Sequence, residues 1–291
     1  MQTRKPVVAG QFYSDDRDSC LADIKHCLKK VNFIEILPKS IVAGIVPHAG
    51  WMFSGSLAAM VFSAIKQRHE KVDTFVIFGA AHGYYGHEPA IYSSGSWTSP
   101  LGEISIDQTL AQTIIENNLA AEEINAHKYE HSIEVQIPFI QYLFPESQIV
   151  PILTPPTKQS IALGQGLGDI ITSLDDKKIV CIGSTDLTHY GPRYGFTPMG
   201  SGEEGLKWAT EVNDKHFIDA VLNMDAQKIL ASAAENSNAC GAGAAAAAVS
   251  AAQNLGRTRG TLLAHTNSNE IMAERMNRRS AESVGYAAII F

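Results

Sequence analysis

Residues 41–48 read IVAGIVPH, an apolar run that ends in a proline and a histidine. Residues 74–82, TFVIFGAAH, and residues 178–189, KIVCIGSTDLTH, repeat this pattern of an apolar run followed by a histidine. Such runs are typical of strands that are buried on both faces, as in a sheet covered by helices. Helical periodicity lies between them, for example over residues 54–67. The sequence therefore predicts an α/β fold with a central, mainly parallel or mixed sheet flanked by helices.

The same alternation of strands and helices extends over most of the chain. Further strands are expected over residues 148–153, 261–264 and 284–291, and further helices over residues 159–174 and 241–248. The glycines and alanines of these two helices favour close packing of the backbone against its neighbours. Asp107 and Ser132 are expected to cap two other helices. Because the pattern continues without a long linker, we expect residues 1–291 to form a single domain.

The composition excludes several classes of protein. The chain has 291 residues, of which 45% are hydrophobic, and this supplies a substantial core. Its net charge is -7 and its basic residues are not clustered, so nucleic acid is not an expected partner. No apolar stretch is long enough to span a bilayer, and the basic N-terminus leads into no long apolar region. We therefore expect a cytoplasmic protein without a membrane partner, and the sequence leaves its oligomeric state open.

The cysteines divide into two groups. Four cysteines dispersed over a chain of this length are too few for a disulfide framework, so reduced thiols are expected. Cys20, Cys27 and Cys181 lie within a predicted helix or strand and are expected to be buried structural thiols. Cys240 differs, because it precedes the helix that is rich in glycine and alanine, and a helix N-terminus favours the thiolate.

Three residues are candidate metal ligands. His48 lies between Pro47 and Gly50, on a stiff exit from a strand, and His82 follows a strand and has only small neighbours. Cys240 would add a thiolate. Two imidazoles and one thiolate can bind zinc or copper and leave positions open for water or substrate. The alternative for each histidine is a hydrogen-bonded residue of a turn.

Four further ionisable residues are candidates for catalysis. Asp186 and His189 lie three residues apart at the end of a strand, where the aspartate can orient the imidazole or bind a metal itself. The alternative is that both residues only complete a turn. His131 can point into the same pocket as an acid, a base or a hydrogen-bond donor to substrate. Glu134 can act beside it, or can only satisfy the dipole of a helix.

Several blocks of the sequence, taken in order, resemble the Memo family, which is related in fold to the class III extradiol ring-cleaving dioxygenases. They are AGQFY at residues 9–13, PHAGW at 47–51, EHSIE at 130–134, STDLTHYG at 184–191, NACG at 238–241 and SVGYAA at 283–288. The likeness runs nearly end to end. It implies a class III extradiol dioxygenase-like α/β fold with a pocket in which the metal-binding positions of the family match His48, His82 and Cys240. Asp186 and His189 would line that pocket.

The resemblance also implies a function. In the dioxygenases the third iron ligand is a carboxylate, whereas the matching position here is Cys240, a softer ligand that suits copper or zinc. The resemblance implies a protein that binds iron or copper, with redox or dioxygenase-like activity as its possible chemistry. In that activity His189 would act as acid or base, Asp186 would fix its orientation, and His131 would bind the substrate. A small-molecule substrate would enter beside Trp51 and Tyr190.

Two other functions use the same pocket. One is zinc-dependent hydrolysis, in which the metal lowers the pKa of its bound water and Glu134 or His189 takes the proton. The other is a signalling module that binds a peptide or phosphopeptide without turnover, which the family resemblance also supports. The identity of the metal separates redox or dioxygenase-like activity from zinc-dependent hydrolysis. Peptide binding by metal-free protein would favour the signalling module.

Overall fold

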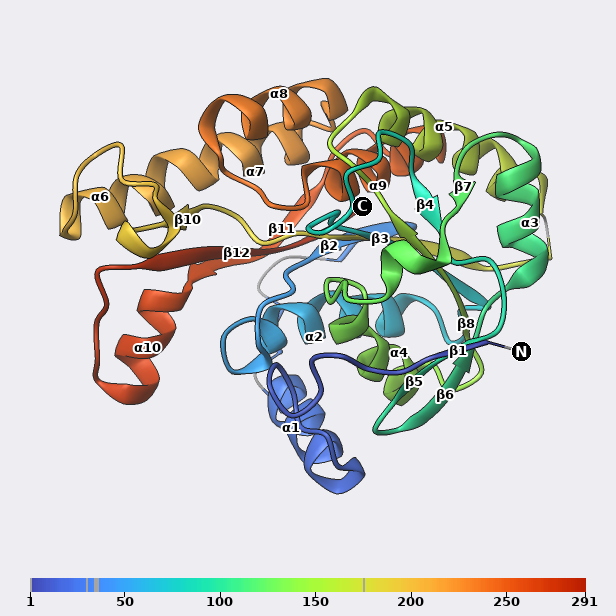
Figure 1. The fold of residues 1–291 in the computed structure, drawn as a ribbon, viewed down its shortest axis with the longest axis horizontal. Coiled ribbons are helices and arrows are strands. Elements are labelled where there is room, and N and C mark those ends of the chain that lie inside the picture. The colour runs from blue at the N-terminus through green and yellow to red at the C-terminus, as the bar shows by residue number, and fades with distance from the viewer. Residues whose placement is uncertain (1, 30, 34–36, 175) are drawn as a thin grey trace.

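The computed structural model describes residues 2–29, 31–33, 37–174 and 176–291, and a nine-stranded mixed sheet forms its centre (Figure 1). The strands follow the order β10-β12-β2-β9-β3-β8-β4-β7, and β11 pairs with β12. Their bounds are β2 Ala43–Val46, β3 Thr74–Gly79, β4 Ala90–Ile91, β7 Ala121–Glu122, β8 Gln148–Leu153, β9 Ile179–Ser184, β10 His189–Tyr190, β11 Thr261–Asn267 and β12 Ser283–Ile290. The predicted α/β class and mixed sheet are confirmed.

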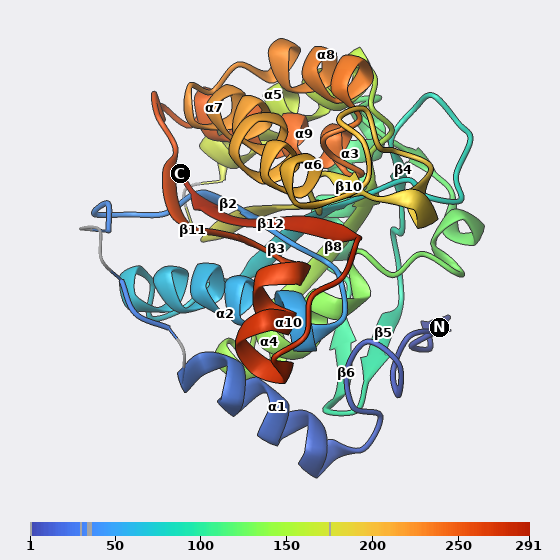
Figure 2. The ribbon, with the colours of Figure 1, turned by 90° about the vertical axis from the view of Figure 1, so that its left-hand side faces the viewer.

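Helices cover both faces of this sheet (Figure 1, Figure 2). One face carries α1 Arg17–Lys29, α2 Trp51–Arg68, α4 Ile137–Leu143 and α10 Ser268–Met276. The other carries α5 Lys158–Ser173, α7 Asp214–Leu222, α8 Ala226–Asn236 and α9 Ala242–Asn254, while α3 Gln108–Glu116 and α6 Glu203–Trp208 lie toward its two ends. A separate three-stranded sheet joins β1 Thr3–Arg4, β5 Ser96–Ser99 and β6 Gly102–Ser105.

The parallel pairing at the centre of the sheet brings the candidate residues together. Strands β2, β9, β3 and β8 are parallel neighbours, whereas β12 and β4 flank them in antiparallel orientation. In the register of β2 and β9, Val46 lies opposite Ser184. Since parallel strands end at the same edge, the segments that follow β2, β3 and β9 meet there. These are the segments that carry His48, His82 and Asp186.

The helix that is rich in glycine and alanine is buried, as predicted. All of α9 from Ala242 to Ala252 is inaccessible to solvent, and the helix packs against β9, β2 and α5. A Cβ atom at Gly164 of α5 would lie 2.3 Å from the carbonyl oxygen of Ala247. Glycine is therefore required for the close approach of α5 to α9, which confirms the packing role predicted for the glycines of α5.

One of the two predicted helix caps is wrong. Asp107 accepts a hydrogen bond from the backbone N–H of Leu110 and caps α3, as predicted. Ser132 caps no helix, because the chain first forms a 3-10 turn at Glu134–Gln136 and α4 begins only at Ile137. The Oγ of Ser132 instead accepts the backbone N–H of Ala80, after β3. Within the described residues, none of the helices has the length and apolar character needed to cross a bilayer.

Candidate metal centre

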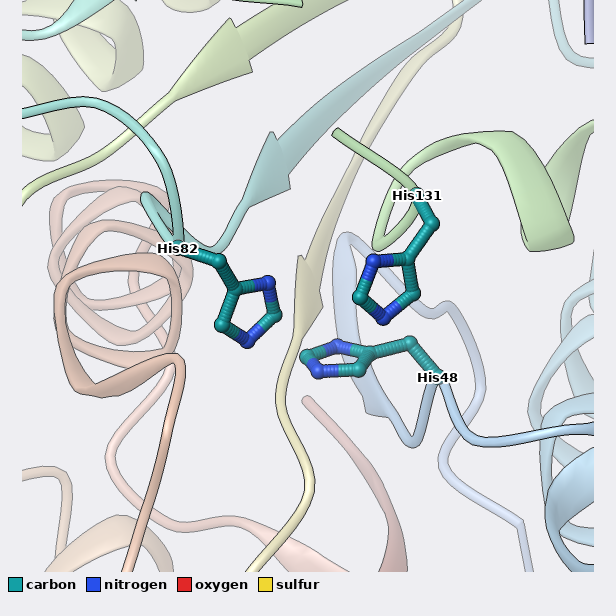
Figure 3. A group of neighbouring side chains, drawn as sticks. All are labelled: His48, His82 and His131. Carbon is teal, nitrogen blue, oxygen red and sulfur yellow. The ribbon is translucent and has the colours of Figure 1, made fainter. Parts of the chain in front are cut away.

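Three imidazoles meet at the edge of the sheet where the parallel strands end. The candidate ligand atoms of His48, His82 and His131 all lie within 4.8 Å of one another. Figure 3 shows the three rings facing one another from separate segments: His48 follows β2, His82 follows β3, and His131 precedes the turn that leads into α4. The rings of His82 and His131 are stacked, with centroids 5.0 Å apart, and His48 meets both edge-on.

Cys240 joins this cluster from the other side of the sheet. Its Sγ lies 3.1 Å from Nε2 of His48, and it also hydrogen-bonds to His82. Its position is fixed by its backbone N–H, which donates to the carbonyl of Asp186, and by α9, which begins two residues later. Burial raises the pKa of the thiol, but the two imidazoles outweigh burial and lower the pKa to about 7. Cys240 therefore carries substantial thiolate character near neutral pH.

Ser184 sets the tautomer of His48. Its Oγ donates to the carbonyl of Ser132 at 2.7 Å, so its contact with Nδ1 of His48 at 3.1 Å requires the imidazole to be the donor. Nδ1 then carries a proton in either charge state: in the imidazolium, Nε2–H faces the thiolate of Cys240, and in the neutral ring Nε2 has the lone pair that a metal binds. A ring whose Nδ1–H is held by the protein and whose other nitrogen is bare is the usual arrangement of a histidine that ligates a metal.

Glu130 holds both of the other histidines. Its Oε1 accepts the backbone N–H groups of His131 and Ser132 at 2.9 and 2.8 Å and lies 3.1 Å from Nδ1 of His82. Its Oε2 accepts the backbone N–H of His82. Burial alone would raise the pKa of this carboxyl, but its bonds to His82 and the backbone hold it well below its usual range. Burial opposes the charge of His82, yet its bonds to Cys240 and Glu130 raise its pKa to about 10.

The sequence alone predicts no function for Glu130. Its place beside His131 in the block EHSIE was the one signal that pointed to the pocket. His131, which the family resemblance implies binds a substrate, lies among the candidate ligands. Burial lowers the pKa of His131, which favours the neutral imidazole that a metal requires.

Asp186 and His189 both lie at the centre, where each side chain hydrogen-bonds to the backbone and the charge of His189 opposes the effect of burial on the pKa of Asp186. The Oδ1 of Asp186 accepts the backbone N–H groups of His48 and Ala49 at 2.7 and 3.3 Å, so the carboxylate shapes the turn that carries His48. Burial raises the pKa of Asp186 to about 6. His189 is oriented by the carbonyl of Leu187, 3.0 Å from its Nδ1. Because a carbonyl only accepts, Nδ1 carries the proton and Nε2 is the nitrogen of His189 that can take one.

A cavity of about 470 Å³ adjoins the cluster. The three histidines, Asp186 and His189 line it together with apolar side chains such as Phe12 and Tyr286. Phe12 packs edge-on against His131, with ring centroids 5.0 Å apart, so apolar surface reaches the histidines directly. Cavities of this size commonly hold small molecules.

Besides Cys240, three predicted residues are absent from the lining of this cavity among the described residues. Trp51 is buried and donates its Nε1–H to the carbonyl of Val135. The hydroxyl of Tyr190 is held at the carbonyl of Gly200. Glu134 forms a buried ion pair with Arg4 at 2.8 Å and accepts the backbone N–H groups of Val7 and Val8. The sequence block that contains each residue fixes its place along the chain, but the packing of the helices decides which way its side chain points.

The donor set fits a transition-metal ion. The Nδ1 atoms of His48 and His82 lie within hydrogen-bonding distance of the protein, burial favours the neutral form of His131, and the Sγ of Cys240 faces His48. Nitrogen and sulfur donors of this kind select iron, copper or zinc over the hard cations magnesium and calcium. Both carboxylate oxygens of Glu130 and the Oδ1 of Asp186 already accept backbone N–H groups.

Comparison with known proteins identifies the family of the chain. The family described as Memo-like protein matches residues 4–290. A MEMO1 family protein of Methanosarcina barkeri is 36% identical over 291 residues, which cover 99% of each chain. MEMO1 family proteins of Pyrococcus furiosus and Thermococcus onnurineus are 36% and 35% identical and cover 99% of this chain, with 98% and 99% of their own lengths matched. A match of this extent, over almost the whole chain and all of its sequence blocks, means that the chain belongs to the Memo family.

Proposed function

We propose that this protein binds one iron or copper ion through His48, His82 and Cys240 and uses it in redox or oxygenase-like chemistry on a small molecule. The observation that carries the proposal is the pairing of Cys240 with His48: Nε2 lies 3.1 Å from the Sγ, and Ser184 holds the other ring nitrogen. A thiolate with imidazoles favours redox-active metals such as copper. When bound, the metal would supply electron transfer and a Lewis acid.

The surrounding residues would divide the remaining work. His189 would exchange a proton with the substrate at Nε2, because its Nδ1–H is occupied by Leu187. Asp186 would keep the turn of His48 in place through its two backbone hydrogen bonds. His131 faces both the cavity and the other histidines, so it would hold the substrate next to the metal.

A second candidate function is zinc-dependent hydrolysis. It is favoured by the mutual approach of His48, His82 and His131 within 4.8 Å, because three imidazoles are a common ligand set of catalytic zinc. In that case His189 would be the base that accepts a proton from water. Glu134 would not act as this base, because its carboxylate is bound to Arg4 outside the cavity.

X-ray absorption spectroscopy at the edge of the bound metal separates the two candidates. The proposal expects one sulfur scatterer at about 2.3 Å, a typical metal–thiolate distance, in the wild type and in His131→Ala. The same scatterer would be lost in Cys240→Ser. A shell of nitrogen and oxygen atoms alone in the wild type, altered in His131→Ala and unaltered in Cys240→Ser, would overturn the proposal in favour of the three-histidine site.

A further inference from the structure

We infer that the cavity binds a small monocarboxylate with an aromatic or similarly flat apolar body, and that Arg193 holds its carboxylate. The inference deepens the proposed function, on which it rests in so far as this cavity is the substrate site. It names the chemical class of the ligand, and it adds Arg193 to the residues of the site.

The apolar part of the cavity is built from four segments of the chain. Phe12 comes from the N-terminal loop, Phe53 from α2, Met272 from α10, and Val284 and Tyr286 from β12. Figure 2 shows α10 beside β12 and α2, and the side chains named from these elements line one cavity. Such side chains remove a flat hydrocarbon body from water, and this is the main source of affinity for small ligands.

Arg193 gives the same cavity a permanent positive charge. It lies in the 3-10 turn Pro192–Tyr194, directly after β10, and it lines the cavity. Its backbone N–H donates to Oε1 of Glu282, but its guanidinium makes no hydrogen bond, ion pair or ring contact with another described residue. A guanidinium binds a carboxylate through two parallel N–H···O bonds, which makes it a specific partner for that group.

The charges around Arg193 favour a ligand with one negative charge. Glu282 lines the cavity beside Arg193, so a dianion such as a phosphate monoester would meet its carboxylate. The other acidic group of the cavity, Asp186, accepts two backbone N–H groups at its Oδ1 and adds to the repulsion of a dianion. His189 also faces the cavity and presents Nε2 to the ligand. One free guanidinium next to one carboxylate therefore matches a monocarboxylate best.

Calorimetric titration of the metal-free protein with three probes tests this inference. Benzoate has the charge and the flat body, benzamide has the body without the charge, and acetate has the charge without the body. We expect wild-type protein to bind benzoate at least tenfold more tightly than benzamide, because a charge-assisted hydrogen bond is lost with the amide. We also expect acetate to bind at least tenfold more weakly than benzoate, because the ring no longer fills the apolar part.

Two variants assign the preference to Arg193. Arg193→Gln should bind benzoate and benzamide equally, whereas Arg278→Gln, which changes another exposed arginine outside the cavity lining, should keep the tenfold preference. Equal binding of benzoate and benzamide by the wild type, an unchanged preference in Arg193→Gln, or equal binding of acetate and benzoate would overturn the inference. Because the titrations use chelated protein, they do not depend on the metal. Failure of the metal proposal would appear separately, in metal analysis.

Discussion

The Sγ of Cys240 lies 3.1 Å from Nε2 of His48, although 192 residues separate them in the sequence. The sheet explains this meeting. Strand β2 ends just before His48, its parallel neighbour β9 ends just before Asp186, and the backbone of Cys240 is bound to the carbonyl of Asp186. The two side chains thus come from distant parts of the sequence to one edge of the sheet, where chemistry in open α/β sheets is usually found.

The thiol of Cys240 should ionise near neutral pH. Because the imidazoles of His48 and His82 lower its pKa to about 7, its alkylation by iodoacetamide in metal-free protein should rise with pH around a midpoint near 7. Mass spectrometry of the modified peptide measures this midpoint. In His48→Gln the midpoint should move to higher pH, because one of the stabilising imidazoles is gone. A midpoint of alkylation in the wild type at the ordinary pKa of thiols, about 8.5, would contradict the contact between Cys240 and the two imidazoles.

Glu130 should act as a positioning residue for the metal centre. Glu130→Gln keeps the shape of the side chain but removes its negative charge. In the wild type this carboxylate holds Nδ1 of His82 and accepts the backbone N–H groups of His131 and Ser132. Loss of such an outer partner costs about 10- to 100-fold in metal affinity. Competition with a chromophoric chelator measures the affinity, and Glu123→Gln, at an exposed glutamate, is the control. Equal affinities for both variants would show that Glu130 is not needed.

Glu134 should matter for stability and not for metal binding. Its carboxylate is buried against Arg4, and Glu134→Gln would leave that guanidinium without a counter-charge. Breaking a buried ion pair in this way costs about 3 kcal/mol in the free energy of unfolding. Urea denaturation measures this loss, and metal content per folded protein should stay unchanged. A variant with wild-type stability but little metal would instead place Glu134 at the metal centre.

Gly285 should be essential for the packing of β12 against the loop that carries Asp186 and His189. A Cβ at this position would lie 2.0 Å from Oδ2 of Asp214, a buried carboxylate that is held by the backbone N–H of Thr188 and by His265. Overpacking of this kind costs about 1–3 kcal/mol, so Gly285→Ala should lower the urea midpoint accordingly.

Gly83→Ala is the matched control for this experiment, because no atom lies within 4 Å of the added methyl group. Its urea midpoint should equal that of the wild type. A similar loss in both variants would mean that the effect comes from glycine itself and not from the contact with Asp214.

Much of the fold could be predicted from the sequence, because buried parallel strands are read directly as apolar runs. The runs before His48, His82 and Asp186 became β2, β3 and β9, with bounds that differ by two residues at most. Parallel pairing then places the residues after these strands at one edge, so their proximity follows from the pattern alone. The candidacy of Cys240 as a ligand could be predicted in a different way, from its place just before a helix.

The details of the site depended on packing that no pattern in the sequence describes. Glu130 receives its role from backbone N–H groups of two separate segments, and only the folded chain brings those together. Trp51 and Glu134 lie within the correct sequence blocks, yet their side chains turn toward Val135 and Arg4 and away from the cavity. The likeness of the sequence blocks thus predicts which segments meet, and the contacts between helices and loops decide which side chains face the cavity.

The most direct test of the metal centre is elemental analysis of protein purified without an affinity tag or added metal. We expect about one equivalent of iron or copper per chain in the wild type and its loss in both His48→Ala and Cys240→Ser, with the circular dichroism spectrum unchanged. Full metal retention in Cys240→Ser, or a wild-type protein that holds neither iron nor copper, would contradict this expectation.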